Sequence, residues 1–109
     1  MPEFREPEKQ KRTDGRLRMN MAANYRLKGK QDWKPCKVLD LSSGGLLMEG
    51  SESFYIDDVI EIQLQLEAML TARLRVTNLS GKKAGCQFLD LTEVQQDQLR
   101  NYVHANLGL

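Results

Sequence analysis

The chain has 109 residues, of which 40% are hydrophobic and 28% charged, a composition typical of one soluble globular domain. Its formal net charge of +1 gives no bulk electrostatic signal for nucleic acid binding. No apolar run approaches the roughly 20 residues that cross a bilayer, and residues 1–7 lack the apolar core of a secretory signal. A cytoplasmic protein without membrane insertion is therefore expected.

The N-terminal segment is rich in charge and poor in apolar side chains. Residues 1–18 carry six lysine or arginine and four acidic side chains, whereas Phe4 and Leu17 are the large apolar residues after Met1. Such a segment buries too little surface to order itself. We therefore predict a flexible arm at residues 1–10, followed by one domain over residues 11–109.

The central part of the chain alternates between apolar and polar side chains with the period of two that is typical of half-buried β-strands. The pattern is clearest from Val59, where Ile60, Ile62, Leu64 and Leu66 share one face. The predicted strands are residues 19–26, 33–40, 45–49, 59–66, 70–78 and 84–89. Between the third and fourth strands, the apolar residues Phe54, Tyr55 and Ile56 are expected to pack on the core.

The period changes near the C-terminus, where a helix is predicted over about residues 92–107. Thr92 and Gln95 form the capping-box pattern that starts a helix. One helical stripe is apolar: it consists of Leu91, Val94, Leu99, Tyr102, Val103 and Leu107. Six short strands and one amphipathic helix predict a mainly β fold, a small antiparallel barrel with a C-terminal α-helix packed on it.

A polar turn with the pattern Asp-x-Ser-x-x-Gly runs from Asp40 to Gly45, between the second and third predicted strands. Aspartate offers acceptors, serine both a donor and acceptors, and glycine leaves room for close approach of another group. Alone, the pattern also describes an ordinary capped turn. An upstream pattern, Arg-x-x-x-Arg at Arg12 and Arg16, gives the turn a further meaning.

Both patterns together, in this order and on these strands, resemble the PilZ domain, a bacterial receptor module for the second messenger cyclic di-GMP. The resemblance covers nearly the whole chain and includes the strand at residues 84–91, which looks like the closing strand of that family. It implies a six-stranded antiparallel barrel with a C-terminal helix. It further implies that the ligand contacts Arg12, Arg16, Asp40, Ser42 and Gly45.

The chemistry of these residue types suits cyclic di-GMP, which carries two phosphates and two guanines. Arginine presents a planar fork of donors to a phosphate or to the O6/N7 edge of guanine. The Asp40 carboxylate can accept from guanine N1–H and N2–H₂, and Ser42 can donate to a phosphate. Weaker candidates for the ligand site are Lys11, Gly44 and Arg75. The sequence leaves open whether one ligand or an intercalated pair binds.

Other chemistry-bearing side chains have structural interpretations. Trp33 is expected to pack rather than to stack on a base, and His104 has no partner for catalysis. Cys36 and Cys86 are expected to be reduced core thiols. We accordingly predict no enzymatic activity, no metal and no cofactor.

The first functional hypothesis is a receptor that reorders its N-terminal arm on binding cyclic di-GMP and signals to an unidentified downstream protein. The resemblance implies control of motility, adhesion or exopolysaccharide synthesis. A ligand-independent adaptor of the same fold is the alternative. A barrel binding RNA or single-stranded DNA is disfavoured, because only 6% of residues are aromatic and the charge is near neutral.

Overall fold

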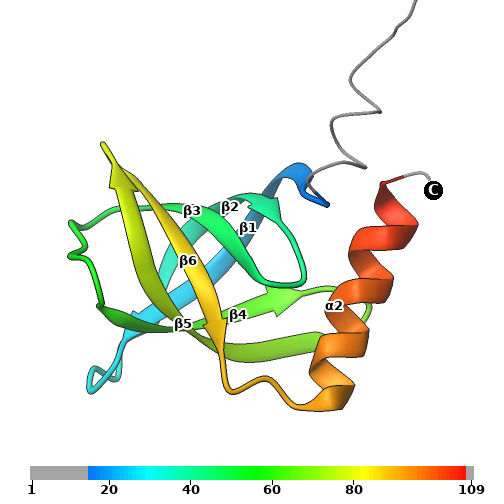
Figure 1. Ribbon diagram of the computed structural model, residues 1–109. Helices are drawn as coiled ribbons and strands as arrows, with labels where there is room; N and C mark the ends of the chain where they lie inside the picture. Colours follow the sequence, from blue (N-terminus) through cyan, green and yellow to red (C-terminus); the bar gives the residue numbers. More distant parts are fainter. Residues whose placement is uncertain (1–14, 108–109) are drawn as a thin grey trace, which may run out of the picture.

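The computed structural model describes residues 15–107, which form six antiparallel strands and one helix. The strands close into a barrel in the order β1-β2-β3-β6-β5-β4 (Figure 1). The mainly β prediction is therefore confirmed. The elements are β1 (Leu17–Leu27), β2 (Lys34–Leu41), β3 (Gly45–Gly50), β4 (Val59–Gln65), β5 (Met69–Ser80), β6 (Lys83–Leu89) and α2 (Glu93–Asn106).

The alternation in the sequence places one face of each strand inside the barrel. In β4 and β5 the inward side chains are those predicted, and Ile60, Ile62 and Leu74 are completely buried. The predicted strand positions differ from the observed ones by at most two residues at either end, with the two-residue differences at the start of β1 and at the end of β5. The barrel interior is thus a continuous apolar core.

Helix α2 packs on one side of the barrel (Figure 1). Its capping box is present: the Gln95 amide donates to Thr92 Oγ1 at 3.1 Å, and the Thr92 amide donates to Gln95 Oε1 at 3.1 Å. Leu99 and Val103 are buried against the barrel. Val94, predicted on the buried stripe, is instead 70% exposed. No helix within residues 15–107 is long and apolar enough to cross a membrane.

The apolar segment before β4 differs from its prediction. Phe54 is buried, whereas Tyr55 is 72% and Ile56 52% exposed. A tight turn explains the difference: the Asp58 amide donates to the Tyr55 carbonyl at 3.1 Å, and Asp57 has a φ of 73°. This turn directs the chain outward after Phe54, so only the first of the three side chains reaches the core.

Tyr25 anchors the barrel end that lies far from the Asp40 turn. Its ring is completely buried and contacts Phe54 edge to face at 5.4 Å between centroids. Its hydroxyl donates to Glu52 Oε2 at 2.6 Å. This hydrogen bond, together with Lys34, lowers the pKa of Glu52 from the ordinary value of 4.5.

We expect Tyr25→Phe to reduce the free energy of unfolding by about 1–2 kcal/mol at pH 7, since it removes a hydrogen bond to a partly solvated carboxylate but keeps the ring. Because the pKa of Glu52 is lowered in the folded state, its contribution is present above pH 4.5 and is lost as the pH falls through the lowered value. Urea denaturation of both proteins at pH 7 and pH 3 measures the difference. An equal difference at both pH values would contradict this account.

Candidate functional site

The Asp40–Gly45 turn connects β2 to β3, and Ser42 organises it. The Ser42 hydroxyl accepts from the amides of Gly44 at 3.3 Å and Gly45 at 3.2 Å, and donates to the Gly45 carbonyl at 3.2 Å. The Ser42 amide donates to the same carbonyl at 2.9 Å. Ser42 therefore caps the turn, and a ligand that accepts from its hydroxyl replaces the bond to Gly45.

Asp40 is the one buried charged or polar residue among residues 15–107, with 7% of its surface exposed. The register shifts in both strand pairings next to Asp40. In the pairing of β2 with β3 the shift lies between Val38 and Asp40, and in the pairing of β1 with β2 it lies between Arg18 and Met21. Bulges re-aim side chains and break strict alternation. Asp40 and its neighbour Leu41 are accordingly both buried.

The buried carboxylate is met by Arg16, which directly precedes β1. Arg16 Nη2 lies 3.2 Å from each carboxylate oxygen of Asp40, although the two residues are 24 positions apart in the sequence. The pairing follows from the register, which sets Leu17 opposite Leu41 and Arg18 opposite Asp40. About half of the Arg16 side chain remains exposed. Arg16 of the Arg-x-x-x-Arg pattern and Asp40 of the Asp-x-Ser-x-x-Gly pattern are therefore in contact.

The two glycines of the turn have different surroundings. A Cβ atom at Gly45 would overlap the backbone carbonyl oxygen of Cys86 on β6, whereas a Cβ at Gly44 would meet nothing within 4 Å. Neither glycine has a positive φ. Gly45 is thus required for the close approach of β3 to β6, a reason that the sequence alone does not provide.

Arg75, a weaker candidate from the sequence, lies two strands away from Gly45. Gly45 is opposite Gln87 on β6, and Gln87 is opposite Arg75 on β5. The Arg75 guanidinium donates to Gln87 Oε1 at 3.3 Å and lies 4.0 Å from an Asp57 carboxylate oxygen. Sequence reasoning missed Gln87, although its outward position between Cys86 and Phe88 follows from the alternation of β6.

A hollow of about 410 Å³ lies beside the turn, between it and α2. Sequence reasoning also missed the contribution of α2, since nothing in the sequence places Gln96 and Arg100 beside Gly44. Arg100 Nη1 is 2.7 Å from Asp97 Oδ1 within the helix. The residues lining the hollow are Ser43, Gly44, Gln87, Phe88, Asp90, Leu91, Gln96 and Arg100.

Comparisons with known proteins identify the family and the fold. The family model of the PilZ domain matches residues 10–105. The chain belongs to the PilZ domain family. Members of this family are ligand-binding receptors for cyclic di-GMP. No curated protein matches the chain.

A solved structure supports the same fold for this PilZ domain. The crystal structure of the PilZ domain of CeSA from a cellulose synthesizing bacterium is similar to it, with a TM-score of 0.66. The match covers 85% of this chain and 95% of that chain at 14% sequence identity. At this identity the likeness concerns the fold, so the ligand contacts are argued from the residues of this chain.

The remaining candidates of this PilZ domain are placed as follows. Lys11 and Arg12 lie outside the described residues. Trp33 packs under the Arg26 guanidinium, whose Cζ lies 4.4 Å from the ring centroid. His104 lies in the last turn of α2 and is exposed.

Both cysteines are free and buried. Burial raises the pKa of Cys36 to about 11 and that of Cys86 to about 12. Both therefore stay protonated at neutral pH and behave as core side chains. Within residues 15–107, no group of three or more His, Cys, Asp or Glu side chains could hold a metal ion.

Proposed function

We propose that this PilZ domain is a receptor that binds cyclic di-GMP between the Asp40–Gly45 turn and the arginines of the N-terminal segment. The observation that carries the proposal is the contact of Arg16 with Asp40, 3.2 Å to each oxygen. It joins the two sequence patterns at one end of the barrel. Here a buried acceptor and a half-exposed guanidinium lie side by side, next to the open surface at Gly44.

The proposed roles follow from hydrogen-bonding capacity. The Asp40 carboxylate accepts from N1–H and N2–H₂ of one guanine, which adenine lacks. Arg16 and Arg12 pair with a phosphate or stack on a base. Ser42 donates to a phosphate oxygen once its bond to Gly45 is exchanged, and Lys11 adds a phosphate contact.

Arg75 borders the same surface through Gln87. Its guanidinium would reach the side of the ligand that lies away from Asp40, above the outer face of β6 and β5. Because Arg75 already has Gln87 and Asp57 as neighbours, we assign it a smaller contribution than Arg16.

Binding would order the arm and thereby create a new surface for a downstream protein. Ordering costs roughly 1–2 kcal/mol per residue, so part of the contact energy offsets this entropy. The expected affinity is micromolar or tighter, which corresponds to about −8 kcal/mol and beyond. The output in motility, adhesion or exopolysaccharide control would then depend on the partner and not on chemistry at the site.

Calorimetric titration with cyclic di-GMP tests the proposal, with GTP and cyclic di-AMP as specificity controls. Arg12→Ala and Arg16→Ala are expected to remove most of the binding, since each deletes a charge-assisted contact worth about 1.5–3 kcal/mol. Arg75→Ala is expected to weaken binding severalfold. Lys82→Ala, an exposed cation in the β5–β6 hairpin, serves as the matched control and should leave the affinity unchanged.

One observation favours a second candidate, a ligand-independent adaptor. The turn is already satisfied by its own contacts, with Arg16 on Asp40 and the Ser42 hydroxyl on Gly45. A ligand therefore has to exchange existing hydrogen bonds. A folded protein that gives no heat with cyclic di-GMP would support the adaptor and reject the receptor.

A further inference from the structure

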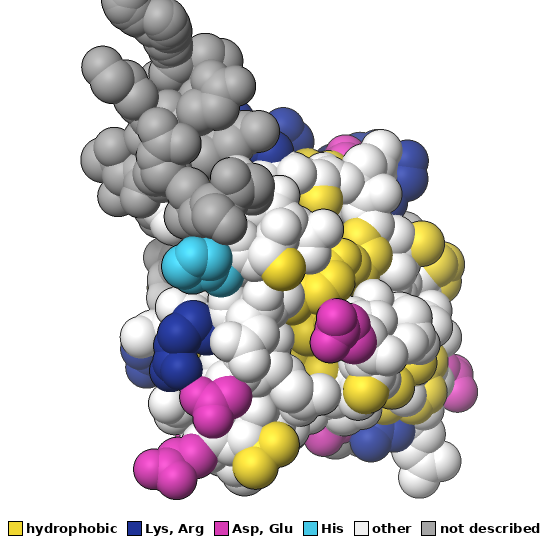
Figure 2. Space-filling view, turned by 90° about the vertical axis from the view of Figure 1, so that its right-hand side faces the viewer, with side chains coloured by type: hydrophobic (Ala, Val, Ile, Leu, Met, Phe, Trp, Pro, Cys, Tyr) yellow, Lys and Arg dark blue, Asp and Glu magenta, His cyan; other side chains and the backbone are white. Residues whose placement is uncertain are grey.

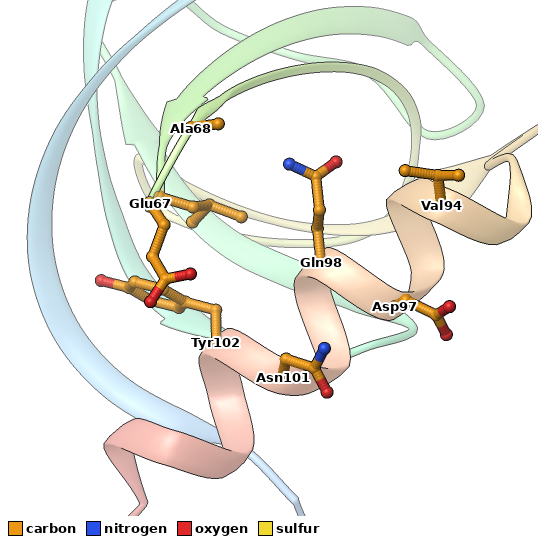
Figure 3. A pocket seen from close by; sticks show the side chains of 8 residues that line it. Glu67, Ala68, Val94, Asp97, Gln98, Asn101 and Tyr102 are labelled. Carbon is orange, nitrogen blue, oxygen red and sulfur yellow. The ribbon is translucent and has the colours of Figure 1, made fainter.

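A groove with an apolar floor lies between α2 and the connection from β4 to β5 (Figure 3). We call it the α2 groove; its apolar lining is Leu66, Ala68, Val94 and the ring of Tyr102. In the close-up, Val94 and Gln98 from α2 face Glu67 and Ala68 across the opening. Its volume of about 300 Å³ is at the bottom of the range of small-molecule sites, so it suits a single large side chain.

The groove belongs to a larger apolar surface. Figure 2 shows hydrophobic side chains gathered in a band on the face that carries α2. Val94 is 70% exposed, and Met69, at the start of β5, is exposed as well. Single exposed apolar residues are ordinary, but a concave apolar surface marks a site that another chain segment covers.

The segment before Gly15 has the composition and length to cover it. Phe4 is its large aromatic residue, and residues 4–12 carry four lysine or arginine side chains against two glutamates. Glu67 places negative charge at the groove, whereas Asp97, also in its lining, is paired with Arg100 at 2.7 Å. An aromatic side chain with flanking cations therefore complements this groove in both shape and charge.

The attachment point permits the contact. The start of β1 lies at the same end of the molecule as the C-terminal end of α2 (Figure 1). Tyr102 lies five residues before the helix C-cap at Leu107, which is about 7.5 Å along the axis. Phe4 lies eleven positions before Gly15, and eleven residue steps span up to about 36–40 Å.

We propose that the N-terminal segment docks Phe4 into the α2 groove of its own chain. Tethering gives this segment an effective concentration of about 1 mM, so even a weak contact would be well populated without a partner. To compete for the groove with equal affinity, a second copy of the chain or another protein would need a concentration above about 1 mM. The groove would be closed to such partners while Phe4 occupies it.

Paramagnetic relaxation enhancement tests this inference. A nitroxide label is attached at Glu3→Cys, which is practical because Cys36 and Cys86 are buried thiols with raised pKa values. We expect strong broadening of the methyl signals of Val94 and Leu66. Leu27 on β1 is paired with Ile60 at the start of β4, whereas Leu66 follows the end of β4. The methyl signals of Leu27 should therefore keep their intensity.

Two variants locate the contact. Phe4→Ser in the labelled protein is expected to lose the broadening at Val94 and Leu66. Val94→Glu should reduce the broadening at Leu66 without unfolding the barrel, because Val94 is exposed. Ile56→Glu introduces the same charge at another exposed apolar position and should change nothing.

Broadening that is equal at the groove and at Leu27, or that survives in Phe4→Ser, overturns the inference. The remaining control is a mixture of two samples: protein with the nitroxide label but without isotope enrichment, and isotope-enriched protein without the nitroxide. Broadening at Val94 in that mixture would assign the groove to a second copy of the chain and likewise overturn it. All measurements are made without cyclic di-GMP, so their outcome is independent of the proposed ligand site.

Discussion

Replacing Asp40 with alanine is expected to weaken the binding of cyclic di-GMP at least about 100-fold, which corresponds to about 2.7 kcal/mol. Asp40 is buried and already holds one guanidinium, so its carboxylate is a fixed acceptor. Its loss removes the acceptor for two guanine donors, each hydrogen bond to a charged group being worth about 1.5–3 kcal/mol. Isothermal titration calorimetry of wild type and variant measures the change.

Asp40→Asn is the matched control for this prediction. Asparagine has the same shape and keeps one carbonyl oxygen, so we expect a clearly smaller loss than for Asp40→Ala. Both variants should remain folded, since Arg16 is half exposed and water can reach its guanidinium when the Asp40 carboxylate is removed. Denaturation curves should show a stability loss of about 1 kcal/mol for Asp40→Ala. Unchanged affinity in a folded Asp40→Ala protein would place the guanine elsewhere.

Gly45→Ala is expected to destabilise the barrel by about 2–3 kcal/mol, the upper part of the range for inserting an atom into a close-packed site. The new Cβ would overlap the carbonyl oxygen of Cys86 and would lie 3.1 Å from its carbonyl carbon and 3.3 Å from Gln87 Cα. All three are backbone atoms of β6, so the strands must separate. For a domain of this size the melting temperature should fall by roughly 10–20 °C.

Gly44→Ala separates this packing effect from ligand contact. A Cβ at Gly44 meets open space, so the stability should stay within about 0.5 kcal/mol of wild type. Thermal unfolding of both variants is the measurement. Equal melting temperatures for Gly45→Ala and Gly44→Ala would show that β3 and β6 are not packed as closely as described. A loss of cyclic di-GMP affinity in Gly44→Ala alone would locate the ligand next to Gly44.

Most of the fold could be predicted because its elements depend on local patterns. The period of two in β4 and β5 fixed which side chains face inward, and Thr92 with Gln95 fixed the start of α2. The predictions that were wrong concern side chains whose burial depends on neighbours distant in the sequence. Ile56 is turned outward where the next residue, Asp57, donates its amide to the Val76 carbonyl on β5 at 2.8 Å, and Val94 is 70% exposed although it lies on the predicted stripe.

The candidate site divides in the same way. The residue types of the turn could be taken from the sequence, and so could the family resemblance, because both depend on short motifs in a fixed order along the chain. Gln87 and Arg100 were missed, since only the strand register and the docking of α2 place them beside Gly44. Whether Arg12 and Lys11 join the site remains a prediction, as they lie outside residues 15–107.

The sequence by itself therefore determined the barrel, the closing helix and the polar turn, all of which follow from periodicity and local hydrogen-bonding capacity. Only the tertiary structure decided that Asp40 is buried and paired with Arg16, because this depends on bulges in two strand pairings. It alone decided that Gly45 serves the contact with Cys86. Strand register is a property of the closed barrel, and no single strand carries it.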